Sequence, residues 1–211
     1  RRSTMIINSE DVVADLNKCK GIVDVLNKGG IMIYPTETVY GIGCDAFNDS
    51  AINRIVSLKQ RLPDKPLIVL VKDIHMLIEL VVELPSIGVS LINKFWPGPL
   101  TLIFNAKPHI NKQLTAGTGK IAVRQSPHPF IRSVFELYSH PIVSTSANIS
   151  NMPPAVSISE IPTSITDNVD LIIDGGKLNN IPSTVIDITD NRIELIREGA
   201  IKKSLIERLF L

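Results

Sequence analysis

Short apolar runs alternate with helix-like stretches along most of this chain, and this alternation restricts the fold more than any other feature. The clearest run, Leu67 to Val71, contains only Leu, Ile and Val, which is typical of a strand buried on both faces of a sheet. Such strands need helices on both sides. We therefore expect an α/β fold, with a mixed sheet and flanking helices. The other expected strands are residues 31–34, 100–104, 121–124, 141–144, 170–173, 184–188 and 193–197.

The stretches between these strands carry helix start and stop signals. Ser9 and Asp73 suit N-cap positions, Pro85 suits a helix start, and Gly29 with Gly30 suits a helix end. The expected helices cover about residues 9–28, 50–58, 73–82, 85–95, 128–138 and 202–210.

Composition limits the class of protein. The chain has 211 residues, 44% of them hydrophobic, and we expect a single domain over residues 1–211 with residues 1–8 as a frayed or added end. A formal charge of +1 provides no global field toward nucleic acid or an anionic membrane. Cys19 and Cys44 have no metal-site spacing, and no apolar run reaches the roughly 18 residues of a membrane-spanning helix. These features predict a cytoplasmic protein that does not use the membrane.

The loop from Tyr34 to Ala46 (YPTETVYGIGCDA) is dense in directional side chains. It combines two threonines, two tyrosines, a carboxylate and two glycines after an apolar strand. Thr36 and Thr38 could simply cap the next element in a tight strand-to-helix turn. The density of donors and acceptors instead favours a ligand-binding loop on a rigid scaffold.

Cations gather where ligands usually bind in α/β folds. Lys59, Arg61 and Lys65 follow an expected helix, and Arg124 and Arg197 end apolar strands. The first group could simply interact with the helix dipole. Guanidinium groups at strand ends more naturally face a cleft, where they could meet the first group over one phosphate.

A run of hydroxyl and amide side chains, Ser144 to Ser150 (STSANIS), follows another expected strand. It could cap a helix or form a hydrogen-bonding shelf for a polar ligand. Ser183, between Pro182 and Thr184, is a weaker signal of the same kind.

Several sharper motifs fail on their context. Residues 41–46 fit G-x-G-x-x-A, but six residues separate them from the strand, whereas a dinucleotide fingerprint has its glycines at the strand-helix turn. Residues 117–120 resemble part of a P-loop but lead into a strand. The four histidines lack HxxxH and HExxH spacing. We expect no protein-made metal site and no Ser-His-Asp hydrolase.

Six ordered blocks together resemble one known family. They are YPTETVYGIG from residue 34, LKQR and KPLIVLV from 58, FWPGPLT from 95, AVR followed by HP from 122, STSANIS from 144 and PSTVID from 182. Over about residues 10 to 200 the chain is similar to the YrdC/TsaC family of threonylcarbamoyl-adenylate synthases. The resemblance implies a twisted α/β sheet with a positively charged concave cavity. It also implies condensation of L-threonine, bicarbonate or CO2, and ATP to threonylcarbamoyl-AMP, with release of pyrophosphate.

The resemblance also implies roles for individual residues. Lys59, Arg61 and Arg124 would be catalytic, with Arg124 holding the threonine carboxylate. Threonine would contact Thr36, Thr38, Tyr40, Arg124, Ser144 and Ser183. The nucleotide would contact Lys59, Arg61, Lys65, Ser146, Asn148 and Arg197. The sequence departs from the family pattern at Leu62, Leu70, Ser126 and Asn151.

The implied chemistry needs no protein nucleophile. The carbamate formed on threonine would attack the α-phosphorus of ATP, so the protein would position substrates and neutralise charge. Mg²⁺ is expected with ATP, held largely by ATP oxygens and water. The product would pass to a separate TsaD/Kae-type transferase that modifies adenosine 37 of tRNAs reading codons that begin with A. This chain would then meet tRNA only indirectly or weakly.

Two alternatives remain. A non-catalytic module of the same fold could bind double-stranded RNA or tRNA, although the charge of +1 and the lack of basic runs with interleaved aromatics argue against it. The related carbamoyl-adenylate step of hydrogenase maturation is expected to need acylphosphatase-like and zinc-finger parts that are not found in this sequence.

Overall fold

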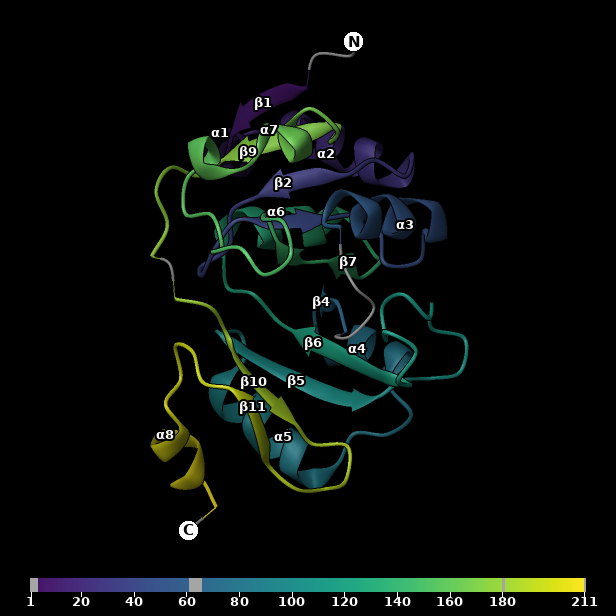
Figure 1. Ribbon diagram of the computed structural model, residues 1–211, viewed down its shortest axis with the longest axis vertical. Coiled ribbons are helices and arrows are strands. Elements are labelled where there is room, and N and C mark those ends of the chain that lie inside the picture. Colours follow the sequence, from purple (N-terminus) through teal and green to yellow (C-terminus); the bar gives the residue numbers. More distant parts are fainter. Residues whose placement is uncertain (1–3, 61–65, 180, 211) are drawn as a thin grey trace.

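Two mixed sheets organise the molecule (Figure 1). The computed structural model describes residues 4–60, 66–179 and 181–210. The strand order is β1-β9-β2-β3-β8 in the five-stranded sheet and β11-β10-β5-β6-β4-β7 in the six-stranded sheet. The expected α/β class is confirmed, but the strands expected in one sheet are divided between two. The strands are β1 (Met5–Asn8), β2 (Met32–Tyr34), β3 (Gly41–Gly43), β4 (Ile68–Leu70), β5 (Leu100–Asn105), β6 (Lys120–Arg124), β7 (Ile142–Val143), β8 (Thr145–Ser146), β9 (Leu171–Asp174), β10 (Thr184–Asp187) and β11 (Glu194–Arg197).

The five-stranded sheet corrects two sequence expectations. Residues 1–8 were expected to be a frayed or added end, but Met5–Asn8 form β1, which pairs in parallel with β9. Residues 41–43 were expected to belong to a long loop, but they form β3, which pairs antiparallel with β2. Gly43 is required there because a Cβ atom would lie 2.4 Å from the Val143 carbonyl oxygen and 2.6 Å from the Tyr34 ring. The glycine pattern therefore serves close strand packing.

Between β7 and β8 the chain passes from one sheet to the other across a single residue. Strand β7 belongs to the six-stranded sheet and β8 to the five-stranded sheet, with Ser144 between them. The Ser144 amide donates to the Ile68 carbonyl at 2.7 Å, which holds this residue against β4. Side chains near Ser144 can therefore reach elements of both sheets.

The helices follow the expected pattern with local changes. The first expected helix is interrupted at Asp15, which has extended backbone angles and caps the second segment by accepting from the Asn17 and Lys18 amides. The helices are α1 (Ser9–Ala14), α2 (Leu16–Asn27), α3 (Asp49–Leu58), α4 (Ile74–Leu80), α5 (Ser86–Phe95), α6 (Pro129–Leu137), α7 (Thr163–Thr166) and α8 (Lys203–Glu207), with a 3₁₀ turn at Ile158–Glu160. Across the described ranges, none of these helices combines the length and hydropathy needed to cross a membrane.

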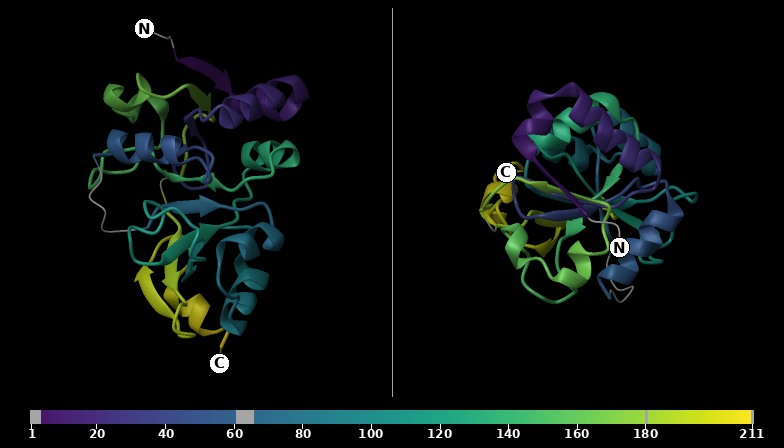
Figure 2. Two further views of the ribbon diagram at one scale, coloured as in Figure 1. Left: turned by 90° about the vertical axis from the view of Figure 1, so that its right-hand side faces the viewer. Right: turned by 90° about the horizontal axis from the view of Figure 1, so that it is seen from above.

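One apolar core connects the two sheets. It includes fully buried residues of both, such as Ile33 on β2 and Leu102 on β5. Helices α2 and α6 lie on one side of the five-stranded sheet and α3 lies on the other (Figure 2). Close packing of this core fixes the position of one sheet relative to the other. The loops at their junction are therefore attached to a rigid scaffold.

Candidate functional site

A cavity of about 620 Å³ lies at the junction of the two sheets. Its walls come from the loop between β2 and β3, the end of β6, the segment around β8, and strands β10 and β11. The residues predicted from the sequence that line it are Thr36, Thr38, Tyr40, Arg124, Ser144, Ser146, Asn148, Ser183 and Arg197. Lys59 lies behind this wall, and Arg61 and Lys65 lie outside the described residues. The structure thus brings together residues that are far apart in the sequence.

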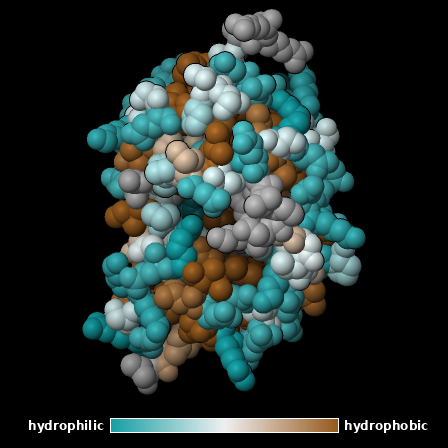
Figure 3. All heavy atoms as spheres, viewed as in Figure 1, coloured by the Kyte–Doolittle hydropathy of each residue, from teal (hydrophilic) through white to brown (hydrophobic). Residues whose placement is uncertain are grey.

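The floor of the cavity is an apolar sheet surface. Ile68, Ala122 and Ile103 are register neighbours on β4, β6 and β5. Val185 lies on β10, opposite Thr101 of β5. Ile103, Ala122 and Val185 form a small cluster separate from the main core, with Ile68 packed against it. In the space-filling view an apolar area lies over these strands and is bordered by hydrophilic side chains (Figure 3). A flat apolar ligand group could lie here beside polar ones.

The two threonines of the first loop have different roles in its structure. The Thr36 hydroxyl donates to the Val39 carbonyl at 2.8 Å and accepts from the backbone amides of Thr38 and Val39. These bonds close the turn. The Thr38 hydroxyl lies 2.8 Å from that of Thr36 and also lines the cavity. Thr36 therefore shapes the loop, and Thr38 is the hydroxyl better placed to meet a ligand.

Tyr40 supports the cavity wall from within. Its hydroxyl donates to the Gly176 carbonyl at 2.7 Å and accepts from the Gly175 amide at 3.0 Å. The ring is completely buried, and burial raises the pKa of this phenol to about 12. Tyr40 therefore joins the loop to the residues after β9 as a neutral hydrogen-bonding group.

Arg124 ends β6 and is 3% exposed. Its guanidinium forms an ion pair with Glu37, whose carboxylate also accepts a hydrogen bond from the Ser126 hydroxyl. The Arg124 Nε is buried without a hydrogen-bond partner in the described part of the chain. Leu70, one of the departures from the family pattern, is the register partner of Arg124 on β4. No role was expected for Glu37 from the sequence, and its place between Thr36 and Thr38 was the only available signal.

The charge of Arg124 persists despite its burial. Removal from water lowers the pKa of its guanidinium to about 10, and the positive charge of Arg197 acts in the same direction. At neutral pH the group is still protonated because this value lies well above 7. A buried cation next to a second cation favours any anion that enters the cavity.

The segment after β7 is held by Lys59. The Lys59 ammonium donates to the Asn148 carbonyl at 2.8 Å and to the Asn148 side-chain oxygen at 3.1 Å, and it also donates to the Ser146 carbonyl. The Ser146 hydroxyl donates to Asn148 Oδ1 at 2.6 Å. Asn151 has φ 68°, a left-handed conformation that Asn tolerates better than most residues. The expected shelf is thus a loop fixed around one buried ammonium group.

The far wall is built by Ser183 and Arg197. The Ser183 hydroxyl lies 2.8 Å from the Thr101 hydroxyl, and Arg197 Nη2 donates to the Ser183 carbonyl at 2.8 Å. Arg197 is exposed at the end of β11, so part of its guanidinium faces solvent. Thr101 was not expected to take part, because an alternating strand residue carries no local signal of its own.

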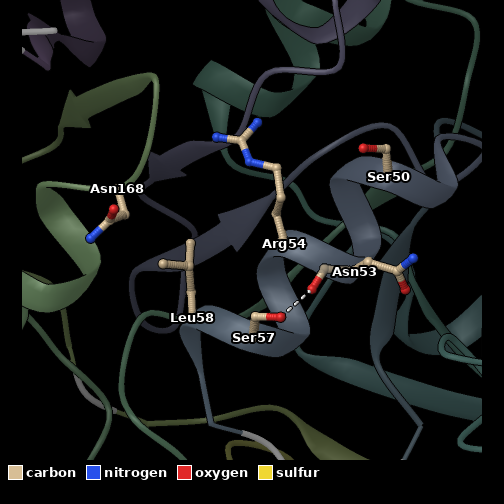
Figure 4. Close-up of a pocket in the computed structure, with 6 residues that line it drawn as sticks. All are labelled: Ser50, Asn53, Arg54, Ser57, Leu58 and Asn168. Carbon is tan, nitrogen blue, oxygen red and sulfur yellow. Dashed lines mark hydrogen bonds between the residues drawn. The ribbon is translucent and has the colours of Figure 1, made fainter.

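Another hollow, of about 820 Å³, opens over α3 (Figure 4). Ser50, Asn53, Arg54, Ser57 and Leu58 of α3 line it together with Asn168. Arg54 is engaged with Asp170 at 3.1 Å. None of the predicted site residues in the described ranges lines this surface, so it adds nothing to the candidate site.

Neither a metal cluster nor a reactive cysteine is seen in the described residues. No group of three His, Cys, Asp or Glu side chains there could hold a metal ion. Cys19 and Cys44 are free and buried, and burial raises the pKa of both thiols. Both are therefore packed side chains that favour the neutral form.

A family model described as telomere recombination, for the Sua5, YciO and YrdC proteins, matches residues 24–199. The chain belongs to the Sua5/YciO/YrdC family. The resemblance seen in the six sequence blocks is thereby confirmed. The site described above lies within the matched residues, since it extends from Thr36 to Arg197.

Relatives within this family include both longer and similarly sized proteins. A Pyrococcus abyssi protein named threonylcarbamoyl-AMP synthase is 34% identical over 207 residues, which are 98% of this chain and 61% of that protein. The crystal structure of P. abyssi Sua5 complexed with L-threonine has a TM-score of 0.90 at 33% identity, with 98% of this chain and 61% of that chain covered. The crystal structure of E. coli YciO has a TM-score of 0.81 at 27% identity, with 89% and 92% covered. The chain thus spans about 61% of the length of the P. abyssi relative.

Proposed function

We propose that this protein is an L-threonylcarbamoyladenylate synthase, which condenses L-threonine, bicarbonate or CO2, and ATP to threonylcarbamoyl-AMP and pyrophosphate. The observation that carries the proposal is a buried, charged Arg124 beside threonine and serine hydroxyls and an apolar floor, all in one cavity. The name of the P. abyssi relative and the L-threonine in the Sua5 structure support it.

Threonine would lie between the first loop and Ser144. Its carboxylate would pair with Arg124, because a guanidinium group matches carboxylate geometry and gains strength where water is excluded. Thr38 and Ser144 offer hydroxyls on the same wall, and Thr36 and Tyr40 keep that wall in shape. Ser183 closes the opposite side.

The nucleotide would use the remaining walls. The cluster of Ile68, Ala122, Ile103 and Val185 offers an apolar surface for the purine ring. Arg197 would face the phosphates with Arg61 and Lys65, which lie outside the described residues. Ser146 and Asn148 would contact the nucleotide from the loop that Lys59 holds. Mg²⁺ would enter as part of the ATP substrate and would be bound mainly by phosphate oxygens and water.

The reaction requires positioning more than covalent catalysis. The threonine amine combines with CO2 to form a carbamate, and a carbamate oxygen then attacks the α-phosphorus of ATP. The new P–O bond forms as the bond to the leaving pyrophosphate breaks. The protein's contribution is to hold two anions within reach of each other and to neutralise their repulsion with fixed cations.

The test is pyrophosphate release from ATP, measured with and without threonine and with and without bicarbonate. The proposal expects release only when all three substrates are present. Release that ignores threonine, or no release under any of these conditions, would contradict it. Serine in place of threonine measures how strongly the side chain is selected.

A second experiment distinguishes synthesis from tRNA binding. With labelled threonine, bicarbonate, ATP and tRNA, we expect pyrophosphate from this chain alone, and stable label on tRNA only after a TsaD/Kae-type transferase is added. The near-neutral charge supports this division, since tight tRNA binding requires several phosphate contacts. Tight tRNA binding without pyrophosphate release would favour the non-catalytic RNA-binding alternative. We expect the reaction to take place in the cytoplasm.

A further inference from the structure

Glu37 makes the ion pair that the substrate carboxylate would otherwise make with Arg124. The two residues are 87 positions apart in the sequence. Only 4% of the Arg124 side chain and 19% of the Glu37 side chain are exposed, so the pair is well shielded from solvent. A contact of this kind either competes with the substrate or prepares Arg124 for it.

The arrangement around Glu37 favours preparation. Thr36 and Thr38 line the cavity together with Arg124, whereas Glu37 between them and Ser126 do not. Glu37 thus holds Arg124 from outside the cavity lining. One guanidinium nitrogen, Nη1, contacts Glu37, while Nε is buried with no hydrogen-bond partner among the residues that the structure describes. Part of the guanidinium therefore keeps its capacity to donate while Glu37 stays in place.

Glu37 is itself fixed by Ser126. The Ser126 hydroxyl donates to one carboxylate oxygen, and Arg124 contacts the other. Ser126 also accepts from the His128 amide at 3.2 Å, at the start of α6. The carboxylate consequently joins the first loop to the turn after β6 and limits the directions in which the guanidinium can point.

Electrostatics give Glu37 a second effect on Arg124. Arg197 lies close enough to disfavour the charged form of Arg124, and burial has the same effect. A carboxylate in contact with the guanidinium opposes both influences. Without it, a buried cation would face another cation, which is a costly arrangement.

We propose that Glu37 is a positioning residue for substrate binding: with Ser126, it holds the Arg124 guanidinium in place, so that Arg124 can receive the carboxylate of the amino-acid substrate. This inference rests on the proposed function. It differs from an autoinhibitory contact, in which Glu37 would imitate the substrate carboxylate and would have to leave.

The two possibilities predict opposite changes in threonine affinity for Glu37→Gln. This substitution keeps the size of the side chain and removes its charge. If Glu37 positions Arg124, threonine binding weakens by roughly tenfold, as expected for losing one charge-assisted hydrogen bond. ATP binding changes by less than about twofold, since Glu37 does not line the cavity. If Glu37 imitates the substrate, the same change tightens threonine binding.

Calorimetric titration of the full chain with L-threonine, and separately with Mg²⁺-ATP, measures both affinities. Glu136→Gln, at an exposed position on α6, is the matched control for the loss of one negative charge. Glu37→Asp keeps the charge and should recover part of the threonine affinity. In steady-state assays, Glu37→Gln should raise the KM for threonine more than it lowers kcat, because the lost interaction acts on binding.

Ser126→Ala tests whether the hydroxyl acts through Glu37. Alone, it should weaken threonine binding by a smaller factor than Glu37→Gln, and in the double variant it should add nothing further.

Unchanged or tighter threonine binding by Glu37→Gln, with the wild type binding threonine normally, would overturn the positioning role alone. A wild type that binds no threonine would overturn the proposed function and this inference together. An equal loss of threonine and ATP affinity would show a general structural effect and would also overturn it.

Discussion

The two ends of strand β6 carry ion pairs that differ in their burial and in their position relative to the cavity. At its start, Lys120 pairs with Asp187 of β10 at 2.7 Å, and 37% of the Lys120 side chain is exposed. At its end, Arg124 pairs with Glu37 of the first loop, and its side chain is 4% exposed. The two cations are the first and last residues of the same five-residue strand.

The surroundings of the two pairs differ. Asp187 accepts additional hydrogen bonds from the Thr189 amide and hydroxyl, so Lys120 is one of several partners. Arg124 lies in the wall of a cavity with buried donor capacity left over. The Lys120–Asp187 pair therefore has a structural role. The Arg124–Glu37 pair leaves a guanidinium in the cavity wall that could bind an anion. Substitutions at the two ends of one strand should separate stability from activity.

The largest effect is expected for Arg124→Lys. The cation is kept, but the planar guanidinium fork that matches a carboxylate is lost. We expect kcat/KM for threonine to fall roughly 10- to 100-fold, since hydrogen bonds to charged groups contribute about 1.5 to 3 kcal/mol. Threonine-dependent pyrophosphate release measures this. Arg132→Lys, on the exposed surface of α6, is the control. Wild-type turnover by Arg124→Lys would remove Arg124 from the proposed site.

Thr38→Val should have a smaller effect at the same cavity. It deletes a neutral hydroxyl, whose hydrogen bond contributes about 1 kcal/mol, so we expect threonine affinity to fall roughly fivefold. ATP affinity should stay nearly constant. Calorimetry with each ligand separates the two, and Thr163→Val on the exposed start of α7 serves as control. Equal losses for both ligands would indicate a disturbed loop, as expected instead for Thr36→Val.

Lys120→Met should leave the reaction unchanged and lower stability slightly. The aliphatic stem is preserved, and partly exposed ion pairs contribute at most about 1 kcal/mol after solvent screening. We expect urea titrations to give a free energy of unfolding lower by at most about 1 kcal/mol, and a kcat/KM for threonine within about twofold of wild type. A tenfold loss of activity would mean that the two ends of β6 are coupled, and it would contradict a purely structural role for Lys120.

The smallest effect is expected for the stability of Asp187→Asn at acidic pH. Burial raises the pKa of Asp187, but the hydrogen bonds from Lys120 and Thr189 outweigh it and hold that pKa below its ordinary value of 3.8. A lowered carboxyl pKa in the folded state stabilises the protein above the unfolded value, and this contribution disappears as pH falls through the folded value. The stability difference between wild type and Asp187→Asn should therefore be present at pH 7 and shrink below about pH 3.8. Urea titrations at pH 7 and pH 3 would reveal it, and a difference that grew in acid would contradict the assignment.

Local patterns in the sequence determined the fold class and most of the candidate site. Continuous apolar runs such as Leu67 to Val71 indicated buried strands, because burial on both faces leaves no place for polar residues. Polar clusters after strands indicated the cavity, since loops at strand ends carry ligand groups in α/β folds. Thr38, Arg124 and Ser144 were identified on that basis and through the family blocks, and the structure places all three on one cavity.

Only the tertiary structure decided which distant residues meet. Pairing between strands depends on contacts across the whole chain, so the sequence did not reveal that Ser144 marks the passage between two sheets or that Met5–Asn8 pair with β9. Nor did it show that the Lys59 ammonium holds the loop at Asn148. The meeting of Glu37 with Arg124, across 87 positions, has no local signature at all. The sequence therefore determined which residues could bind a ligand, and tertiary packing decided which of them hold the binding residues in place.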